Sequence, residues 1–303
     1  MRKILAILSA GMIIPVAAYA QEVPAESGAD VVLTNPVAME FAARPTDPVT
    51  FALGGTSAFH SAAARVQEEM KMDASVIATP WSTKTSKEFD LGADIFFKAG
   101  KHFGAGVNFG MGLGEKYNPG IAGKNSFQPM DMAVGASVAY GIIPAVGIGA
   151  SVRYLYSKTT PQHHFGTVGA DILLSGGVKG FRYAAGVTNI GGKVKAADGT
   201  KYAIPAAGTV AVGYDHAFSK HGIGASFQGD YFFKGGFRCG VGAQYNYNEM
   251  VYVRAGYSYG GKTVLPSYAS LGAGFHFKGF HLDVAALIGD ITGTVMIGAG
   301  YRF

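Results

Sequence analysis

The sequence has few of the features that mark soluble domains or helical membrane proteins. Among its 303 residues there is one cysteine, Cys239, so an intramolecular disulfide is excluded. After the first twenty residues, no segment is apolar without interruption. Because a membrane-spanning helix needs roughly 20 consecutive apolar residues, a helical membrane protein is also excluded.

The N-terminus carries the one unbroken apolar run. Arg2 and Lys3 precede it, and it ends in Ala18-Tyr19-Ala20, a small-x-small cleavage site before Gln21. Residues 1–20 are therefore predicted to be an export signal. Removing Arg2 and Lys3 lowers the formal charge from +5 to +3, so the charge gives little reason to expect a nucleic-acid partner.

The chain is rich in glycine and aromatic residues, and its apolar and polar side chains alternate along the sequence. Glycine accounts for 45 residues, about twice its usual share of roughly 7%, and 16 Tyr and 20 Phe accompany a single Trp. In residues 293–303 every second side chain is apolar, as on one face of a strand, and the other face is small and polar. The apolar face holds Val295, Ile297, Ala299, Tyr301 and Phe303.

This alternation recurs about fourteen times, and no helices are left to cover the apolar faces. The predicted strands are 73–81, 86–98, 103–113, 128–140, 145–157, 165–175, 180–190, 203–214, 222–233, 236–247, 250–259, 266–278, 280–289 and 293–303. A closed barrel can expose an apolar outside to lipid because closure leaves no unpaired strand edge. The sequence therefore predicts an all-β fold over residues 73–303, a transmembrane up-and-down antiparallel β-barrel of about 14 strands in a bacterial outer membrane.

Residues 21–72 lack the alternation and contain four prolines. Such a segment ahead of a barrel is either a periplasmic leader or a plug folded into the lumen. We favour the plug, because the apolar side chains of Ala52, Leu53 and Phe59 are poorly suited to water.

The connections between the predicted strands alternate between tight and long. Bacterial barrels have short periplasmic turns and longer extracellular loops, so this alternation of tight and long connections supports the even strand count and puts both termini of the barrel in the periplasm. The tight turns are 99–102, 141–144, 176–179 and Gly279, and the longer loops include 114–127, 158–164, 191–202 and 260–265.

Charged side chains fall almost entirely on the inward strand positions. A charge on the lipid face costs about 2–4 kcal/mol near the midplane, which explains this segregation. The inward polar set is Glu88, Asp90, Asp94, Asp131, Arg153, Asp171, Arg182, Asp230, Arg238, Arg254, Asp283 and Arg302, with Gln228, Gln244 and His276. We interpret these charges as a neutralised network, paired between opposing walls or through the plug, in preference to a selective constriction. Inward glycines at 104, 106, 110 and 112 leave space for a plug or a bound apolar ligand.

No residue pattern points to catalysis, a cofactor or a metal site. Ser270 and His276 lie on one predicted strand face, but six residues of strand separate them by about 20 Å. The adjacent His163 and His164 point apart in an extended chain, so they do not form a metal site. We therefore expect a protein that is not an enzyme.

Glycine- and tyrosine-rich segments recur through the second half of the chain. They include Ala185–Gly191, Ile204-Pro205, Gly213-Tyr214, Val241–Tyr247, Val253–Tyr257 and Leu271–Phe275. In these segments the chain resembles the PorV/PorQ family of outer-membrane barrels, which are related to the FadL fatty-acid transporters and associated with type IX secretion. The motif residues are Asn189, Gly191, Pro205, Gly213, Tyr214, Gln244, Tyr245, Arg254, Gly256 and Tyr257. The resemblance implies a barrel of fourteen strands.

Three functional hypotheses follow from the barrel and the resemblance. The leading one is a component of type IX secretion that holds cargo or a secretion partner through loops 114–127 and 191–202. The alternative is a FadL-like channel for a small hydrophobic molecule, lined by Phe59, Phe96 and the inward glycines. The third is a sealed structural barrel. Besides outer-membrane lipid, the expected partner is the barrel-insertion machinery, for which Tyr301 and Phe303 at the aromatic C-terminus resemble the assembly signal.

Overall fold

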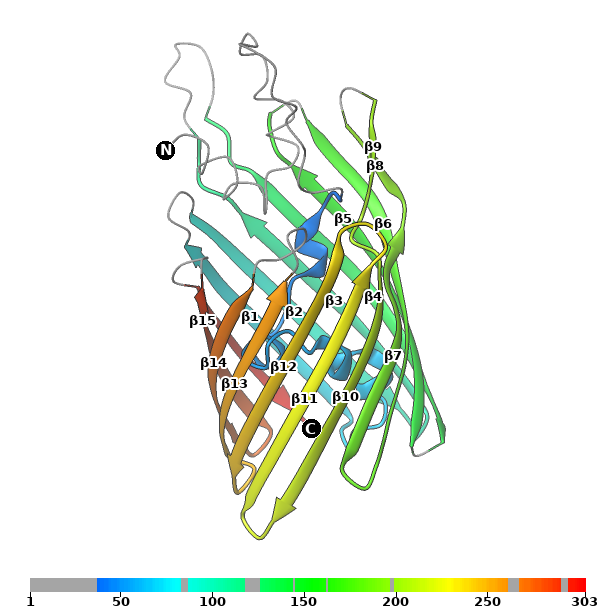
Figure 1. Ribbon diagram of the computed structural model, residues 1–303, viewed down its shortest axis with the longest axis vertical. Coiled ribbons are helices and arrows are strands. Elements are labelled where there is room, and N and C mark those ends of the chain that lie inside the picture. Colours follow the sequence, from blue (N-terminus) through cyan, green and yellow to red (C-terminus); the bar gives the residue numbers. More distant parts are fainter. Residues whose placement is uncertain are drawn as a thin grey trace.

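A closed antiparallel barrel of fourteen strands forms the body of the protein (Figure 1). The computed structural model describes residues 37–82, 87–117, 126–143, 145–161, 163–196, 199–260, 267–289 and 294–303. The predicted fold is confirmed. The predicted signal 1–20 and residues 21–36 of the segment behind it lie outside the described residues.

The barrel strands follow one another around the wall, β7 pairs with β10, and β16 closes the barrel against β1. Their bounds are β1 (Met72–Ser82), β2 (Lys87–Ala99), β3 (Phe103–Leu113), β4 (Met130–Ile143), β5 (Val146–Lys158), β6 (His164–Val178), β7 (Phe181–Gly191), β10 (Ala207–Phe218), β11 (His221–Phe232), β12 (Gly236–Tyr247), β13 (Val251–Gly260), β14 (Tyr268–Phe277), β15 (Phe280–Gly289) and β16 (Val295–Arg302).

The two faces of the wall differ as the alternation predicts. On β16, Ile297 is 44% exposed on the outside, whereas the neighbouring Met296 is 3% exposed and faces the lumen. The same contrast runs around the wall, where exposed Val, Ile, Leu, Phe and Tyr side chains alternate with inward small, polar or charged ones. Lipid therefore takes the place of a protein core on the outside of the barrel.

The largest difference from the predicted strand bounds is at 203–214. The barrel strand there, β10, begins at Ala207, because Pro205 is buried and has no N–H to donate to a strand ladder. Ala203 belongs instead to a separate two-stranded hairpin of β8 (Lys193–Lys195) and β9 (Lys201–Ala203).

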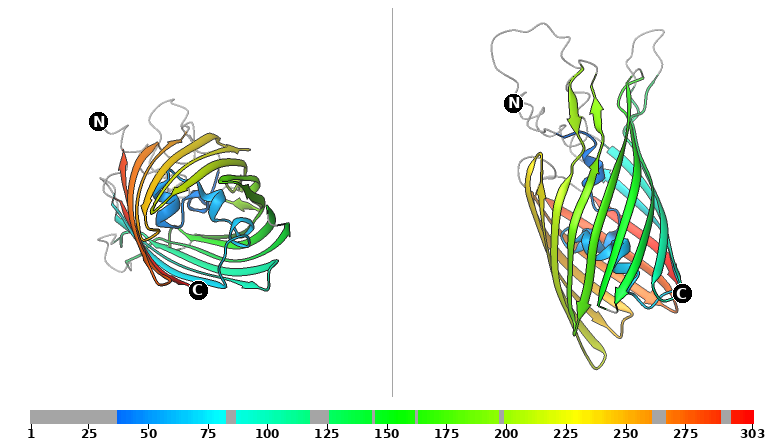
Figure 2. Two further views of the ribbon diagram at one scale, coloured as in Figure 1. Left: turned by 90° about the horizontal axis from the view of Figure 1, so that it is seen from below. Right: turned by 90° about the vertical axis from the view of Figure 1, so that its right-hand side faces the viewer.

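Residues 37–71 run through the inside of the barrel, and we call this part of the chain the plug (Figure 2). It contains four short helices, η1 (Glu40–Ala43), α3 (Pro48–Ala52), η2 (Ser57–His60) and α4 (Ala62–Arg65). Asp47 caps α3, since its Oδ1 accepts a hydrogen bond from Thr50 N at 2.8 Å, and proline occupies the first helical position. No helix among the described residues is long and apolar enough to cross a membrane.

Glycines at two places allow the plug to approach the wall. Gly54 has φ +69°, and a Cβ there would lie 2.5 Å from the carbonyl oxygen of Val241 on β12. On β5, a Cβ at Gly149 would lie 2.6 Å from the backbone N of Ala63 in α4. The plug is therefore seated by backbone-to-backbone contact, which only residues without a side chain permit.

Candidate functional site

A cavity of about 1910 Å³ lies between the plug and the wall. At the end with the long loops it is lined by Lys116 and Lys158, and at the end with the tight turns by Tyr252 and Arg302. By the rule for bacterial barrels these two ends are extracellular and periplasmic. The cavity thus extends past the plug from one end of the barrel to the other.

The inward glycines of β3 have two different roles. A Cβ at Gly104 or Gly106 would meet the ring of Phe96, which is 1% exposed and packs on Val66 of the plug. At Gly110, by contrast, no atom lies within 4 Å of the position that a Cβ would occupy. The expectation that Phe96 lines the route is wrong, because its ring fills the space left by two of the glycines; Gly110 does border the cavity.

Apolar and polar groups share the lining of the cavity. The plug contributes Phe41 and Phe59, and the wall contributes Ile77, Leu173 and Met296. Three carboxylates border the same space, Glu88 and Asp90 on β2 and Asp131 on β4. Gly112 on β3 lies between these strands, and a Cβ there would lie 2.7 Å from Asp90 Oδ1.

Ion pairs between strands occur around the wall from β5 through β16 to β1. Arg238 Nη2 lies 2.8 Å from Asp230 Oδ2, and Arg254 Nη1 lies 2.6 Å from Asp283 Oδ1, with all four side chains buried. The other wall pairs are Arg153 with Asp171, Arg182 with Asp215, and Arg302 with Asp73. Every pair joins neighbouring or next-neighbouring strands. Pairing between opposing walls, one of the two expected arrangements, does not occur among the described residues.

Two arginines of the plug supply the pairing on β2. Arg44 Nη1 lies 3.8 Å from Glu88 Oε2 and 3.9 Å from Asp90 Oδ2. Arg65 Nη1 lies 2.5 Å from Asp94 Oδ1. The plug is therefore part of the charge balance of the wall. Sequence reasoning missed both arginines, because their segment has no strand alternation from which the direction of a side chain could be predicted.

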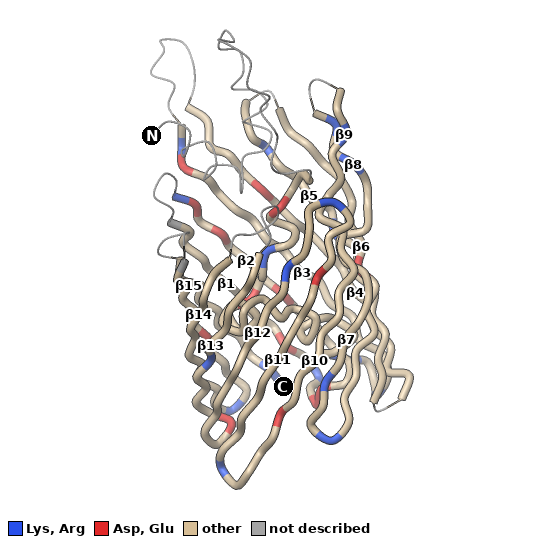
Figure 3. Tube along the Cα trace, in the orientation of Figure 1, with Lys and Arg blue, Asp and Glu red and all other residues tan. Residues whose placement is uncertain are grey.

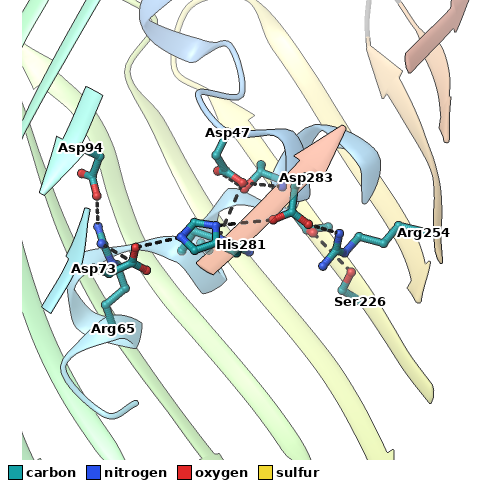
Figure 4. A network of polar contacts seen from close by, with 12 residues as sticks. Asp47, Arg65, Asp73, Asp94, Ser226, Arg254, His281 and Asp283 are labelled. Atoms are coloured by element: carbon teal, nitrogen blue, oxygen red, sulfur yellow. Dashed lines mark hydrogen bonds and ion pairs between the residues drawn. The ribbon is translucent and has the colours of Figure 1, made fainter. Parts of the chain in front are cut away.

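A chain of polar contacts connects the plug with β2, β1, β15 and β13, which lie on one stretch of the wall (Figure 4). It runs from Asp94 through Arg65 to Asp73 on β1, and then through His281 to Asp283 on β15. His281 Nε2 lies 3.3 Å from Asp73 Oδ1, and Arg254 ends the chain on Asp283. Asp73 and His281 were not among the predicted site residues, although both lie at inward strand positions.

Asn189 lies at a kink of β7. It has φ +53°, and the pairing of β6 with β7 shifts register beside Asp171. Asp171 Oδ1 accepts a hydrogen bond from Asn189 N at 2.7 Å, and Arg153 Nη2 donates to Asn189 Oδ1 at 2.6 Å. Asn189 Nδ2 also donates to Ala42 O of the plug at 3.3 Å. The motif residue thus fastens the plug to a bend in the wall.

The remaining motif residues do not gather at one place. Gly213 and Gly256 face the plug, Gln244 Nε2 lies 3.4 Å from Asp215, and Gly191 pairs with Gly169. The outward-facing motif residues are Tyr214, Tyr245 and Tyr257. At the C-terminus, Tyr301 packs on Phe280, and Phe303 exchanges backbone hydrogen bonds with Met72 at the barrel seam. Their role in assembly stays a prediction.

No group of His, Cys, Asp and Glu side chains in the described part of the chain has an arrangement that could hold a metal ion. Ser270 Oγ donates to Ala52 O of the plug at 3.0 Å, while His276 contacts Asp283. The two side chains that are the formal catalytic candidates thus serve separate structural contacts.

Comparison with known proteins finds matches at the level of structure. No family model matches the chain, and no curated protein does. The toluene transporter TbuX of Ralstonia pickettii has a TM-score of 0.60 at 14% identity, covering 87% of this chain and 100% of that one. The toluene transporter TodX of Pseudomonas putida has a TM-score of 0.57 at 14% identity, covering 86% and 97%. A FadL homologue of Pseudomonas aeruginosa has a TM-score of 0.52 at 11% identity, covering 86% and 99%.

This chain is an outer-membrane β-barrel. The closed wall, its apolar outside and the likeness to outer-membrane transporters agree on this point. At identities this low the likeness establishes the fold, which is FadL-like. The structures named above give no specific support to the resemblance to PorV/PorQ or to a link with type IX secretion.

Proposed function

We propose that the protein is a channel through which small hydrophobic molecules cross the outer membrane, with the cavity beside the plug as their route. The observation that carries the proposal is the extent of the cavity, which borders residues at both ends of the barrel while the plug occupies only part of the lumen. A sealed structural barrel has no need of such a space.

The lining of the cavity fits a hydrophobic solute. Phe41 and Phe59 of the plug and Ile77 of the wall offer apolar contact, and small-molecule sites are mostly apolar with a few polar groups. The charged residues of the wall are largely paired, either with one another or with Arg44 and Arg65 of the plug, so little unpaired charge is left to bind an ion. The solved relatives in fold are described as toluene transporters, which is the substrate class that this chain is proposed to share.

The secretion hypothesis rests on the sequence motifs alone. Loop 114–127, one of its two proposed contact sites, lies outside the described residues from 118 to 125. The other, 191–202, contains the β8–β9 hairpin, which folds onto the plug.

Binding of a hydrophobic fluorophore tests the proposal. The purified protein is titrated with N-phenyl-1-naphthylamine, and the bound dye is displaced with toluene or with palmitate to size the site. Gly110→Trp places an indole in the open part of the cavity, so we expect at least tenfold weaker dye binding.

Val107→Trp on the same strand is the matched control. Val107 is 56% exposed on the lipid face, where an added indole leaves the cavity unchanged. Equal dye binding by the wild type and Gly110→Trp, with both correctly folded, would contradict the proposed route.

A further inference from the structure

The β8–β9 hairpin, at the loop end of the barrel, carries three lysines (Figure 3). Lys195 is directly opposite Lys201 in the strand pair, and Lys193 is two residues before Lys195. Side chains at these positions point to the same side, because faces alternate along a strand and opposite residues share a face. All three lysines are exposed.

The other face of the hairpin is anchored. Val194 is 5% exposed and packs with Tyr202 in a cluster that includes Leu155 of β5 and Met39 of the plug. Backbone contact adds to this, since Ala38 N of the plug donates to Ala203 O at 2.8 Å. The hairpin is therefore held in place, and its lysine face is turned away from the lumen.

This arrangement carries an electrostatic cost that the described residues do not offset. Like charges directly opposite each other in a strand pair destabilise it. None of the three lysines forms an ion pair with a described residue. Asp198, between the two strands in the sequence, lies outside the described residues, and residues 193–203 carry three lysines against this one acidic residue. An anchored surface with this charge pattern is complementary to an anion outside the chain.

The register of the neighbouring strands gives the depth of the lysines. Gly192 N, directly before β8, donates to Val168 O of β6 at 3.1 Å, and β8 lies beside β6. From Val168 towards the loop end, β6 reaches His164, whose ring lies 6.1 Å from that of Tyr156. Aromatic girdles mark the membrane interface in such barrels, so the lysines lie near the level of the lipid headgroups.

We propose that the lysine face of the β8–β9 hairpin binds phosphate groups of the anionic glycolipid in the outer leaflet. The lysines lie on the face of the hairpin opposite the one that packs on the plug and β5, and near the headgroup level this exposed positive face is complementary to lipid phosphate. Ammonium groups are compact donors that suit phosphate oxygens. This lipid site is separate from the cavity and does not depend on the proposed channel function.

The test compares two pairs of lysines in the full-length protein. Lys195→Gln/Lys201→Gln alters the hairpin, and Lys179→Gln/Lys220→Gln makes the same change of charge in two exposed turns at the opposite end of the barrel. Retention of lipopolysaccharide is measured by native mass spectrometry after titration with either the phosphorylated or the dephosphorylated lipid.

We expect the hairpin variant to bind phosphorylated lipopolysaccharide less tightly, by about fivefold for each lysine removed. The turn variant should bind like the wild type, and the dephosphorylated lipid should not distinguish the three proteins. In uncharged detergent the hairpin variant should be at least as stable as the wild type, because the repulsion between Lys195 and Lys201 is gone.

Three results would overturn the proposal. Equal losses in the hairpin and turn variants would show only a general effect of charge, and equal binding of the dephosphorylated lipid would exclude phosphate recognition. Unchanged lipid binding together with lysine-dependent retention of an acidic protein would assign the surface to a protein partner instead.

Discussion

At the scale of single residues, the buried arginines of the wall are each ion-paired with a carboxylate. Arg254 and Asp283 are each 3% exposed, and β14 between them carries glycine at Gly272 and Gly274. The missing side chains leave room for the ion pair to form over the intervening strand. Removing one partner of such a pair leaves the other charge buried, which costs more than the pair itself contributes.

Arg254→Ala should therefore destabilise the barrel by about 3 kcal/mol, at the lower end of the range for buried pairs, because His276 and His281 remain near Asp283. Arg302→Ala is the control: the Arg302 side chain is 48% exposed, and Arg65 and His281 remain beside the buried Asp73, so its loss should cost less than about 1 kcal/mol. Urea unfolding in lipid vesicles measures both, and equal midpoints for the two variants would speak against the placement of Arg254.

Glu40 in the plug is a second residue with an unusual environment. Its side chain is 4% exposed, and neither carboxylate oxygen has a hydrogen-bond partner among the described residues. Burial raises the pKa of Glu40 to about 9, and nearby Arg44 only partly opposes this. The folded protein then binds a proton that the unfolded chain releases above its ordinary pKa near 4.5.

Stability should accordingly fall as the pH rises from about 4.5 to about 9, by at most about 1.4 kcal/mol per pH unit from this group. Glu40→Gln keeps a neutral side chain at every pH, so it should stabilise the protein at pH 8 and flatten the profile. Unfolding midpoints at pH 5, 7 and 9 check this. A wild-type profile that rises across the same window would refute the burial argument.

At the scale of elements, the plug and the wall depend on each other. Backbone of the plug lies against inward glycines of β5, β12 and β13, and Arg44 and Arg65 contribute to the charge balance on β2. The plug helices are too short to be stable alone, so tertiary contact is what holds them.

Gly54→Ala should displace the plug. The added methyl group would meet the carbonyl oxygens of Val241 and Tyr257, and φ +69° is strained for alanine. Gly100→Ala is the matched control, because Gly100 also has positive φ, +73°, but lies at an exposed turn with no atom within 4 Å of the position that a Cβ would occupy.

We expect trypsin to cleave after Arg65 at least tenfold faster in Gly54→Ala than in the wild type, with no change in Gly100→Ala. Equal protection in all three proteins would mean that the plug tolerates a side chain at this contact.

The strands could be predicted from the sequence because lipid imposes one rule on all of them. Every outward position must be apolar, so alternation such as that from Val295 to Phe303 shows which side chains face the lipid. Counting such segments gives the number of strands. This rule did not give the correct start of β10. Because of Pro205 the strand begins only at Ala207, and residues 193–195 and 201–203 before it form the β8–β9 hairpin. Local alternation cannot tell a barrel strand from such a hairpin.

The candidate site could be predicted only in part. Alternation identified the inward charges of the wall, including Asp94 and Arg254, but not their partners, because partners depend on register and on the plug. Arg65 is the partner of Asp94 and comes from a segment whose path inside the barrel is set by tertiary contact. Gly110 was one of four equivalent glycines in the sequence, and only the position of Phe96 separates it from Gly104 and Gly106.

At the scale of the whole molecule, the barrel combines a lipid-facing outside, a largely neutralised wall and a plug that leaves part of the lumen open. The cavity borders both ends of the barrel, and Gly110 is a wall position where a side chain would enter open space. These features together are the basis of the proposed channel. The lysine face of the hairpin concerns the surrounding membrane and not the route.

Uptake of N-phenyl-1-naphthylamine by Gram-negative cells tests the central claim most directly, because the intact outer membrane excludes this dye. Cells producing the wild type, Gly110→Trp or Val107→Trp are compared with cells carrying no copy, at matched levels of folded barrel on a heat-modifiability gel. We expect uptake several times faster with the wild type and Val107→Trp, and a return to the background rate with Gly110→Trp. A wild-type rate equal to the background, or an undiminished rate with Gly110→Trp, would contradict this claim.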